Sequence, residues 1–109
     1  MSKVYVTQEA GRKVDGRWVP KVDLSPAMQF GEIVILQPAG SSFYLPKENV
    51  RELKERLREF TDEDYIIPMG DPVLMCAAVC IASQRTGGRL RILKWDKFSH
   101  SYTPINLEV

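Results

Sequence analysis

The stretch that most constrains the fold of this chain runs from residue 64 to residue 108. It begins with the short apolar segment 65–67, continues with an uncharged run over 72–82, and ends in two apolar stretches separated by residues 97–100. This order predicts a strand, a helix and a two-stranded hairpin. The stretch therefore specifies a packed core, and it contains no recognisable catalytic motif.

The uncharged run is predicted to be a buried helix. Asp71-Pro72 is a typical N-cap followed by a first helical residue, and Gly87 is a typical stop. Because residues 72–82 carry no charge, we expect neighbouring elements to cover this helix on several sides. Cys76 and Cys80 share one face of it, are poorly placed for a local disulfide, and are expected to be reduced and buried.

The last two strands are predicted to pair in one register. A four-residue turn at 97–100 places Trp95 opposite Tyr102, because antiparallel partners sum to a constant. Four aliphatic residues then share one face, namely Leu90, Ile92, Ile105 and Leu107. The other face carries Arg89, Arg91, Leu93, Trp95, Tyr102, Pro104 and Glu108. Since proline cannot donate to a ladder, the last strand is expected at a sheet edge.

Further strands are predicted upstream. Alternation over 3–8 is typical of a half-buried edge strand, and the continuous apolar run 32–37 is typical of a central strand covered on both faces. A brief extended piece is expected at 43–45. The segment 9–30 has no sustained period and is treated as an irregular segment or lid, although Asp15-Gly16 favours a turn and a short hairpin.

An amphipathic helix is predicted over 46–60. Its apolar stripe consists of Val50, Leu53, Leu57 and Phe60. On the other side, two pairs with i,i+4 spacing are expected, Arg51 with Glu55 and Glu52 with Arg56. These charges are interpreted as a solvated helix face.

Together these elements predict one α+β domain over residues 1–109. The expected order is ββαβαββ, with a mixed or antiparallel sheet, one amphipathic helix, one buried helix and a C-terminal β-hairpin. A chain of 109 residues that is 44% hydrophobic and 27% charged has the size and composition of a single globular domain. No apolar run approaches the roughly 20 residues that cross a bilayer, so a cytoplasmic protein without a membrane segment is expected.

Charge excludes a simple polycation, because the net charge is +1. The distribution is uneven: residues 1–30 carry five basic and three acidic groups, residues 31–73 five and nine, and residues 74–109 five and two, giving +2, −4 and +3. If the two basic segments lie together in the fold, they form a basic face.

The predicted binding candidates are aromatic residues beside arginines. Trp95 and Tyr102 would stand opposite one another, close to Arg89 and Arg91, and such residues anchor protein interfaces and stack on bases. The alternative is that the two aromatic rings complete a second core cluster under segment 9–30.

A second binding candidate lies in segment 9–30. Trp18 stands there beside Arg17, with Lys13 and Lys21 close by in the sequence. The alternative for this tryptophan is a lid on the core.

Catalytic and metal sites are not expected. His100 falls in the predicted turn, and no zinc set can be built with Cys76 and Cys80 without opening the apolar helix. The carboxylates at 62–64 lack the spacing of a cation loop and are interpreted as a solvated turn. The single glycine before Asp71 and the acidic cap itself do not favour a phosphate site. No cofactor is predicted, and no small-molecule substrate is evident from the sequence.

A resemblance adds to this interpretation. An acidic residue and tyrosine before a strand, Gly70-Asp71-Pro72 opening an apolar helix, the run 88–96 and a last strand containing tyrosine resemble small accessory proteins of bacteriophages and prophages. The resemblance covers roughly the last two thirds of the chain. It implies a phage accessory or host-modulating role, with no functional residue to carry over.

The sequence therefore predicts a non-enzymatic binding or regulatory module. It would act on a host protein or through self-association as a homodimer. The alternative is a nucleic-acid-binding protein that uses the aromatic and arginine face of the C-terminal hairpin.

Overall fold

The computed structural model describes residues 2–40 and 46–109. The expected extended piece at 43–45 lies outside these residues. The main sheet contains β1 (Lys3–Val6), β4 (Glu32–Ile35), β5 (Tyr65–Ile67), β6 (Arg89–Asp96) and β7 (Ser101–Glu108). The helices are α1 (Pro46–Arg56), α2 (Pro72–Thr86) and the short 3₁₀ helix η1 (Ser25–Phe30). A separate hairpin pairs β2 (Gly11–Val14) with β3 (Arg17–Pro20).

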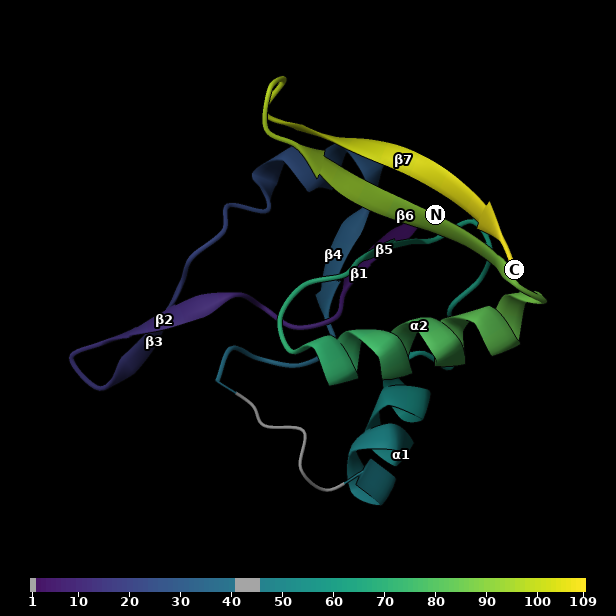
Figure 1. Cartoon of the computed structure of the whole chain (residues 1–109), viewed down its shortest axis with the longest axis horizontal. Helices are drawn as coiled ribbons and strands as arrows, with labels where there is room; N and C mark the ends of the chain where they lie inside the picture. The colour runs from purple at the N-terminus through teal and green to yellow at the C-terminus, as the bar shows by residue number, and fades with distance from the viewer. Residues whose placement is uncertain (1, 41–45) are drawn as a thin grey trace.

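The five strands form a mixed sheet in the order β4-β1-β5-β6-β7 (Figure 1). The first four are parallel, and β7 returns antiparallel to β6. The predicted α+β class is confirmed, and the predicted order ββαβαββ describes the main sheet and its two α-helices. The β2–β3 hairpin is inserted between β1 and β4, with Asp15 and Gly16 at its turn as the sequence favoured.

The predicted positions of the first two sheet strands are wrong. β1 is central, between β4 and β5, whereas β4 is the edge strand. The alternation in β1 was misleading because Tyr5 is buried and packs edge-on against Phe60, with ring centroids 5.3 Å apart. β4 is apolar because both of its faces are covered, with Val34 against one core cluster and its neighbours Ile33 and Ile35 against the other. Coverage on both faces does not require a central position.

The core on one face of the sheet is formed with α1 and α2, and in Figure 1 α2 lies below the strands with α1 below α2. The predicted helix over 46–60 is shorter, since α1 ends at Arg56. The predicted apolar stripe is confirmed, since Leu53 of α1 and the following Leu57 and Phe60 are buried in this core and Val50 packs against it. On its solvated side Glu52 pairs with Arg56 at 2.9 Å, and Glu55 pairs with Arg58 at 2.8 Å in place of the expected Arg51.

α2 begins and ends where the sequence predicts. The Asp71 carboxylate accepts hydrogen bonds from the backbone N–H groups of Val73 and Leu74, and Gly87 adopts a left-handed conformation at φ 65°. Pro72 occupies the first turn, where its missing N–H costs nothing.

The prediction that α2 is covered on several sides is wrong. Leu74, Ala78 and Ala82 are buried against the sheet, but Val73 on the outer side is 60% exposed. Cys76 and Cys80 are also exposed, which corrects the expectation of buried thiols. The outer stripe of α2 lacks charge but is not covered, because the sheet and α1 contact only part of the circumference of the helix.

The opposite face of the sheet is covered by η1. Ala27 is fully buried there, and this second core cluster contains Val4, Val6, Ile67, Leu93 and Tyr102. Segment 9–30, predicted as irregular or a lid, thus contains a hairpin and a 3₁₀ helix. The helix contacts β1, β4 and β7, whereas the β2–β3 hairpin extends away from the main sheet (Figure 1).

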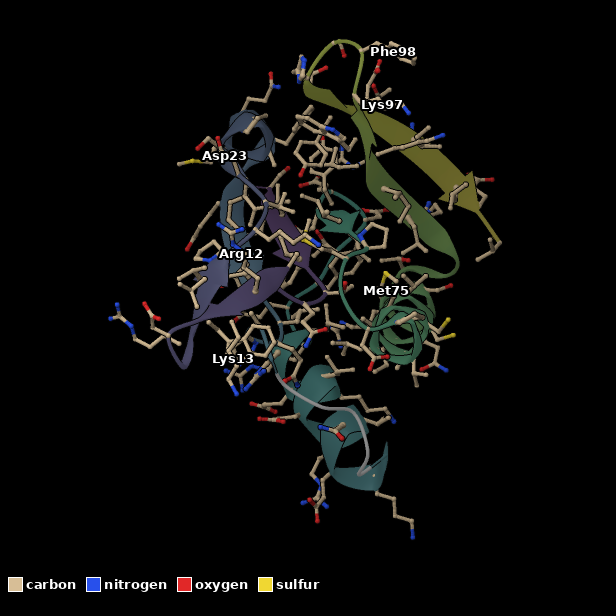
Figure 2. The ribbon with its side chains drawn as sticks, turned by 60° about the vertical axis from the view of Figure 1, so that its left-hand side comes forward. Arg12, Lys13, Asp23, Met75, Lys97 and Phe98 are labelled. Carbon is tan, nitrogen blue, oxygen red and sulfur yellow. The ribbon has the colours of Figure 1, made fainter. Side chains whose placement is uncertain are left out.

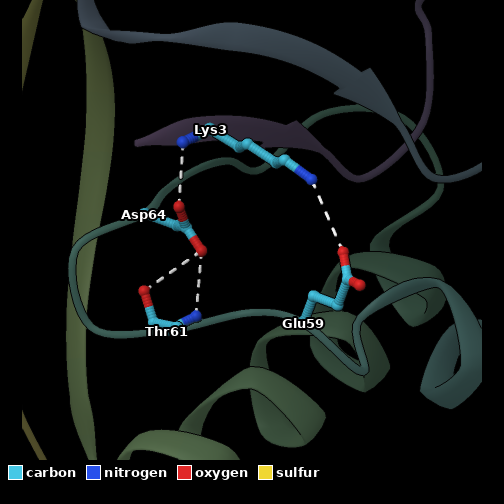
Figure 3. Close-up of polar contacts among 4 residues, drawn as sticks. All are labelled: Lys3, Glu59, Thr61 and Asp64. Carbon is cyan, nitrogen blue, oxygen red and sulfur yellow. Dashed lines mark hydrogen bonds and ion pairs between the residues drawn. The ribbon is translucent and has the colours of Figure 1, made fainter. Parts of the chain in front are cut away.

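The carboxylates at 62–64 are not all in a solvated turn, as the sequence had suggested. Asp64 is 4% exposed, and one of its oxygens accepts the backbone N–H of Lys3 at 2.8 Å (Figure 3). Its other oxygen accepts the backbone N–H and the hydroxyl of Thr61, at 2.9 and 3.3 Å. The Lys3 ammonium separately pairs with Glu59 at 3.6 Å. Asp64 therefore ties the start of β1 to the loop that follows α1.

Within residues 2–40 and 46–109, no helix is both long and apolar enough to cross a membrane.

Candidate binding groove

A groove of about 920 Å³ lies between the β6–β7 hairpin and two segments from elsewhere in the chain. One segment precedes η1 and contributes Lys21, Val22, Asp23 and Pro26. The other follows β5 and contributes Ile67, Pro68 and Met69. The hairpin supplies the remaining residues, Ile92, Leu93, Lys94, Trp95, His100, Tyr102, Ile105 and Leu107. Figure 2 shows Asp23 across from the hairpin, whose tip carries Lys97 and Phe98.

The hairpin has the predicted register. Trp95 pairs with Tyr102, Ile92 with Ile105 and Leu90 with Leu107, and the strands are joined by a turn over residues 97–100. The predicted edge position of β7 is also confirmed. Hairpin residues from both faces of this ladder line the groove.

The aromatic pair at the groove is asymmetric. The rings of Trp95 and Tyr102 meet edge to face, with centroids 5.0 Å apart. Tyr102 is only 5% exposed and belongs to the second core cluster, whereas Trp95 is 43% exposed. The two interpretations from the sequence therefore apply to different residues, because one ring completes a core and the other presents a surface.

Hydrogen bonds hold the hairpin tip in place. The Asp96 carboxylate accepts the backbone N–H of Phe98 at 2.9 Å and that of Ser99 at 3.4 Å, and these bonds lower its pKa. His100 has a left-handed backbone at φ 52° and its ring lies 6.3 Å from the Trp95 ring, centroid to centroid. It is exposed in the turn, where the sequence placed it.

Charged groups surround the apolar interior of the groove. The Asp23 carboxylate accepts hydrogen bonds from Ser25, and this lowers its pKa, so it is ionised at neutral pH. Burial raises the pKa of Tyr102, and the nearby Asp23 charge raises it further, so the phenol stays neutral and able to donate. Lys21 and Lys94 also line the groove. The arrangement suits an apolar group with polar flanks.

The two arginines predicted beside the aromatic pair are engaged within the chain. Arg89 pairs with Asp62 at 3.2 Å. The Arg91 guanidinium lies over the Tyr65 ring at 4.2 Å, and it donates to the Tyr65 hydroxyl at 3.1 Å and to the Glu63 carbonyl. Neither arginine lines the groove. Both arginines thus connect β6 to the loop before β5.

Arg17 and Trp18 are not brought to the groove. They lie on β3, in the separate hairpin that also carries Arg12 and Lys13 (Figure 2). A Cβ atom on Gly40 would lie 2.4 Å from the Trp18 indole, so this ring rests closely on the glycine. Trp18 therefore anchors its hairpin to the loop after β4 while remaining 48% exposed.

Sequence reasoning missed half of the groove. Asp23, Pro26, Ile67 and Met69 are far from the hairpin in the sequence, and no periodicity links them. They meet it because parallel pairing puts the end of β5 beside β6 and because η1 covers β1 and β7. Within the described residues, no cluster of three or more His, Cys, Asp or Glu side chains could hold a metal ion.

The chain was compared with known protein families, curated proteins and solved structures. The model of the Phage Pam3 gp32-like protein family matches residues 2–109. The chain belongs to this family. Membership confirms the predicted resemblance to phage proteins and extends it to the N-terminal third, which the resemblance had left out. No curated protein and no solved structure matches the chain.

Proposed function

We propose that this member of a phage protein family is a non-enzymatic accessory module that binds a host protein. The groove is the observation that carries the proposal. It would accept an apolar side chain of the host protein, with Trp95 as the main contact. Binding there would modulate the host protein by covering the surface that supplies this side chain.

The composition of the groove supports a protein partner. Its volume of about 920 Å³ is at the upper end of the range for ligand pockets, and its interior is formed mainly by aliphatic and aromatic side chains. Tryptophan is one of the residue types enriched among interface hot spots. Trp95 is partly exposed and lines this apolar groove. Lys21, Lys94 and Asp23 would then orient the polar flanks of the inserted segment.

Nucleic-acid binding is the alternative, and the arginine contacts give it less support. Stacking on Trp95 would need cations close by to neutralise phosphates. Arg89 and Arg91 are already paired with Asp62, Glu63 and Tyr65, so binding phosphate would first break these contacts. Lys94 and Lys97 remain as hairpin cations for this alternative.

Affinity capture from extracts of a bacterial host tests the proposal. Wild-type protein and the variants Trp95→Ala and Trp18→Ala are immobilised, and each extract is divided and treated with or without nuclease. We expect a protein that wild type and Trp18→Ala retain, that Trp95→Ala loses, and that survives nuclease. Equal retention by wild type and both variants would contradict a role for the groove.

Salt dependence separates the two partner classes. Phosphate contacts release counterions, so the logarithm of the affinity falls by about 0.9 per phosphate for each tenfold rise in salt, whereas apolar insertion gives a shallow slope. The captured partner is titrated into the Trp18→Phe variant. The chain has two tryptophans, so Trp95 is the one that remains in this variant. A change in its fluorescence with a shallow slope supports the proposal, and capture abolished by nuclease supports the alternative.

A further inference from the structure

β7 is the outermost strand on its side of the main sheet, with β6 as its neighbour there (Figure 1). The backbone N–H of Val109 donates to the Gly88 carbonyl at 2.9 Å, which continues the β6–β7 ladder by one pair. Since hydrogen-bonded residues alternate along an antiparallel strand, odd-numbered residues of β7 bond to β6. The N–H and C=O groups of Tyr102, Asn106 and Glu108 therefore point outward.

Pro104 belongs to the outward-pointing set. Its position is consistent with an edge strand, because the missing N–H is on the side that β6 does not use. Proline and charge are devices that limit pairing at an edge. Here the proline limits edge pairing in the first half of β7, and residues 105–108 remain able to pair with another strand.

The side chains of this half are apolar on the helix side of the sheet. Ile105 and Leu107 lie opposite Ile92 and Leu90 of β6, and each remains 40% exposed. An exposed edge with aliphatic side chains is a template for another strand.

We propose that this edge pairs with β7 of a second copy of the chain, antiparallel and around a two-fold axis at Asn106. In this register residue numbers across the junction sum to 212, so Ile105 of each copy faces Leu107 of the other. Combined with the observed β6–β7 register, the junction creates two rows of four aliphatic residues. Each row reads Leu90, Leu107, then Ile105 and Ile92 of the second copy.

The hydrogen-bonding groups support this register. The two Asn106 residues exchange N–H and C=O bonds at the axis, and the N–H of Glu108 in each copy donates to the Pro104 carbonyl of the other. Pro104 acts only as an acceptor in this register, through its backbone C=O, so its missing N–H is not needed. An axis at residue 105 would place Ile105 against itself and Leu107 against Thr103, which breaks the aliphatic rows.

The charges also fit a second copy. Glu108 faces Pro104 across the junction, so no two like charges stand directly opposite each other. Arg91 is the cross-strand neighbour of Asn106, and its contacts with Tyr65 and Glu63 hold it on its own subunit.

The size of the junction sets the expected affinity. A stable interface buries roughly 800 Å² per partner, and one half-strand with two aliphatic residues contributes less than that. We therefore expect a reversible dimer that forms at micromolar or higher concentrations. The junction shares Ile105 and Leu107 with the groove, but the proposal goes beyond the groove, since the partner is this chain and the contact is strand pairing.

Analytical ultracentrifugation over a concentration series tests the proposal. Wild type should shift from monomer to dimer, and Asn106→Asp should stay monomeric, because two carboxylates would face each other at the axis. Within one subunit the same carboxylate lies opposite Arg91, which favours folding. Phe98→Ser is the matched control, because Phe98 is 90% exposed at the hairpin tip and outside the junction.

Cysteine crosslinking tests the register directly. In a Cys76→Ser and Cys80→Ser background, Asn106→Cys should crosslink to its own copy on oxidation, because hydrogen-bonded pairs have Cα atoms about 5.5 Å apart, within disulfide range. Glu108→Cys should not, since it faces residue 104.

The results separate this proposal from the groove proposal. Trp95→Ala should leave the dimer unchanged, and Asn106→Asp should leave capture of the host protein unchanged. A wild-type protein that is monomeric up to millimolar concentration, a dimer unaffected by Asn106→Asp, or equal crosslinking at 106 and 108 would each overturn the inference.

Discussion

The two halves of the sheet differ in how they are covered. β4, β1 and β5 are covered on one face by α1 and α2 and on the other by η1, and Val4, Tyr5 and Ile66 are almost fully buried. The β6–β7 hairpin begins in the same core but extends beyond it, with Trp95, Ile105 and Leu107 partly exposed. Apolar residues in the first half therefore serve the fold, whereas the hairpin also carries three partly exposed apolar residues, Trp95, Ile105 and Leu107.

The largest expected effect comes from placing a charge on each side of α2. Ala78 is buried against the sheet, so Ala78→Asp should destabilise by more than about 3 kcal/mol, because the carboxylate would be buried without a partner. Val73→Asp, on the exposed first turn, should change stability by about 0.5 kcal/mol or less. Chemical denaturation measures both. Equal losses would mean that the outer side of α2 is covered after all.

The aromatic pair gives the next largest effect. Tyr102→Ala should cost roughly 3 kcal/mol, the usual cost of truncating a buried aromatic residue. Trp95→Ala should cost clearly less, because the ring is half exposed, while it abolishes host-protein capture. Denaturation curves are compared with capture by the same proteins. A larger stability loss for Trp95→Ala than for Tyr102→Ala would assign both rings to the core.

The reactivity of the two thiols of α2 tests whether the outer side of this helix is exposed. Cys76 and Cys80 are exposed in the structure, so both should react with a thiol reagent without denaturant, at rates near those of the unfolded protein. The reaction is followed by mass spectrometry, with the urea-unfolded protein as reference. Slow modification would instead support the prediction from the sequence that both thiols are buried.

The smallest expected effect is on alkaline stability. Burial raises the folded-state pKa of Tyr102 above 10.0, so the unfolded chain loses this proton first as the pH rises. Stability should therefore fall above about pH 10, and Tyr102→Phe should reduce that fall. Tyr5, whose pKa is also raised by burial, contributes to the remainder. Thermal unfolding from pH 8 to 11 provides the measurement, and identical profiles for both proteins would exclude Tyr102 as a cause.

The fold could be predicted largely from local patterns. The caps of α2, the stripe of α1 and the hairpin register depend on residues close in sequence, and each is confirmed. The central position of β1 could not be predicted, because Tyr5 has a polar hydroxyl and a ring that packs on Phe60, far along the chain. The exposed side of α2 was missed because absence of charge does not show what covers a helix.

The candidate site was predictable only on the hairpin. Trp95 and Tyr102 followed from register, but their different burial depends on Ala27 and η1, which local patterns did not place. Arg89 and Arg91 were expected on a free face, and their partners Asp62 and Tyr65 come from the loop before and the start of β5. Parallel pairing of distant strands decides these contacts.

Differential hydrogen–deuterium exchange on the captured complex tests the central claim most directly. The claim is that the β6–β7 hairpin and the groove beside it bind the partner. We predict that the partner slows exchange at 21–26, 67–69 and 92–107 and leaves α1 and the β2–β3 hairpin unchanged. Protection concentrated on α1, or on 11–20 around Trp18, would contradict the claim.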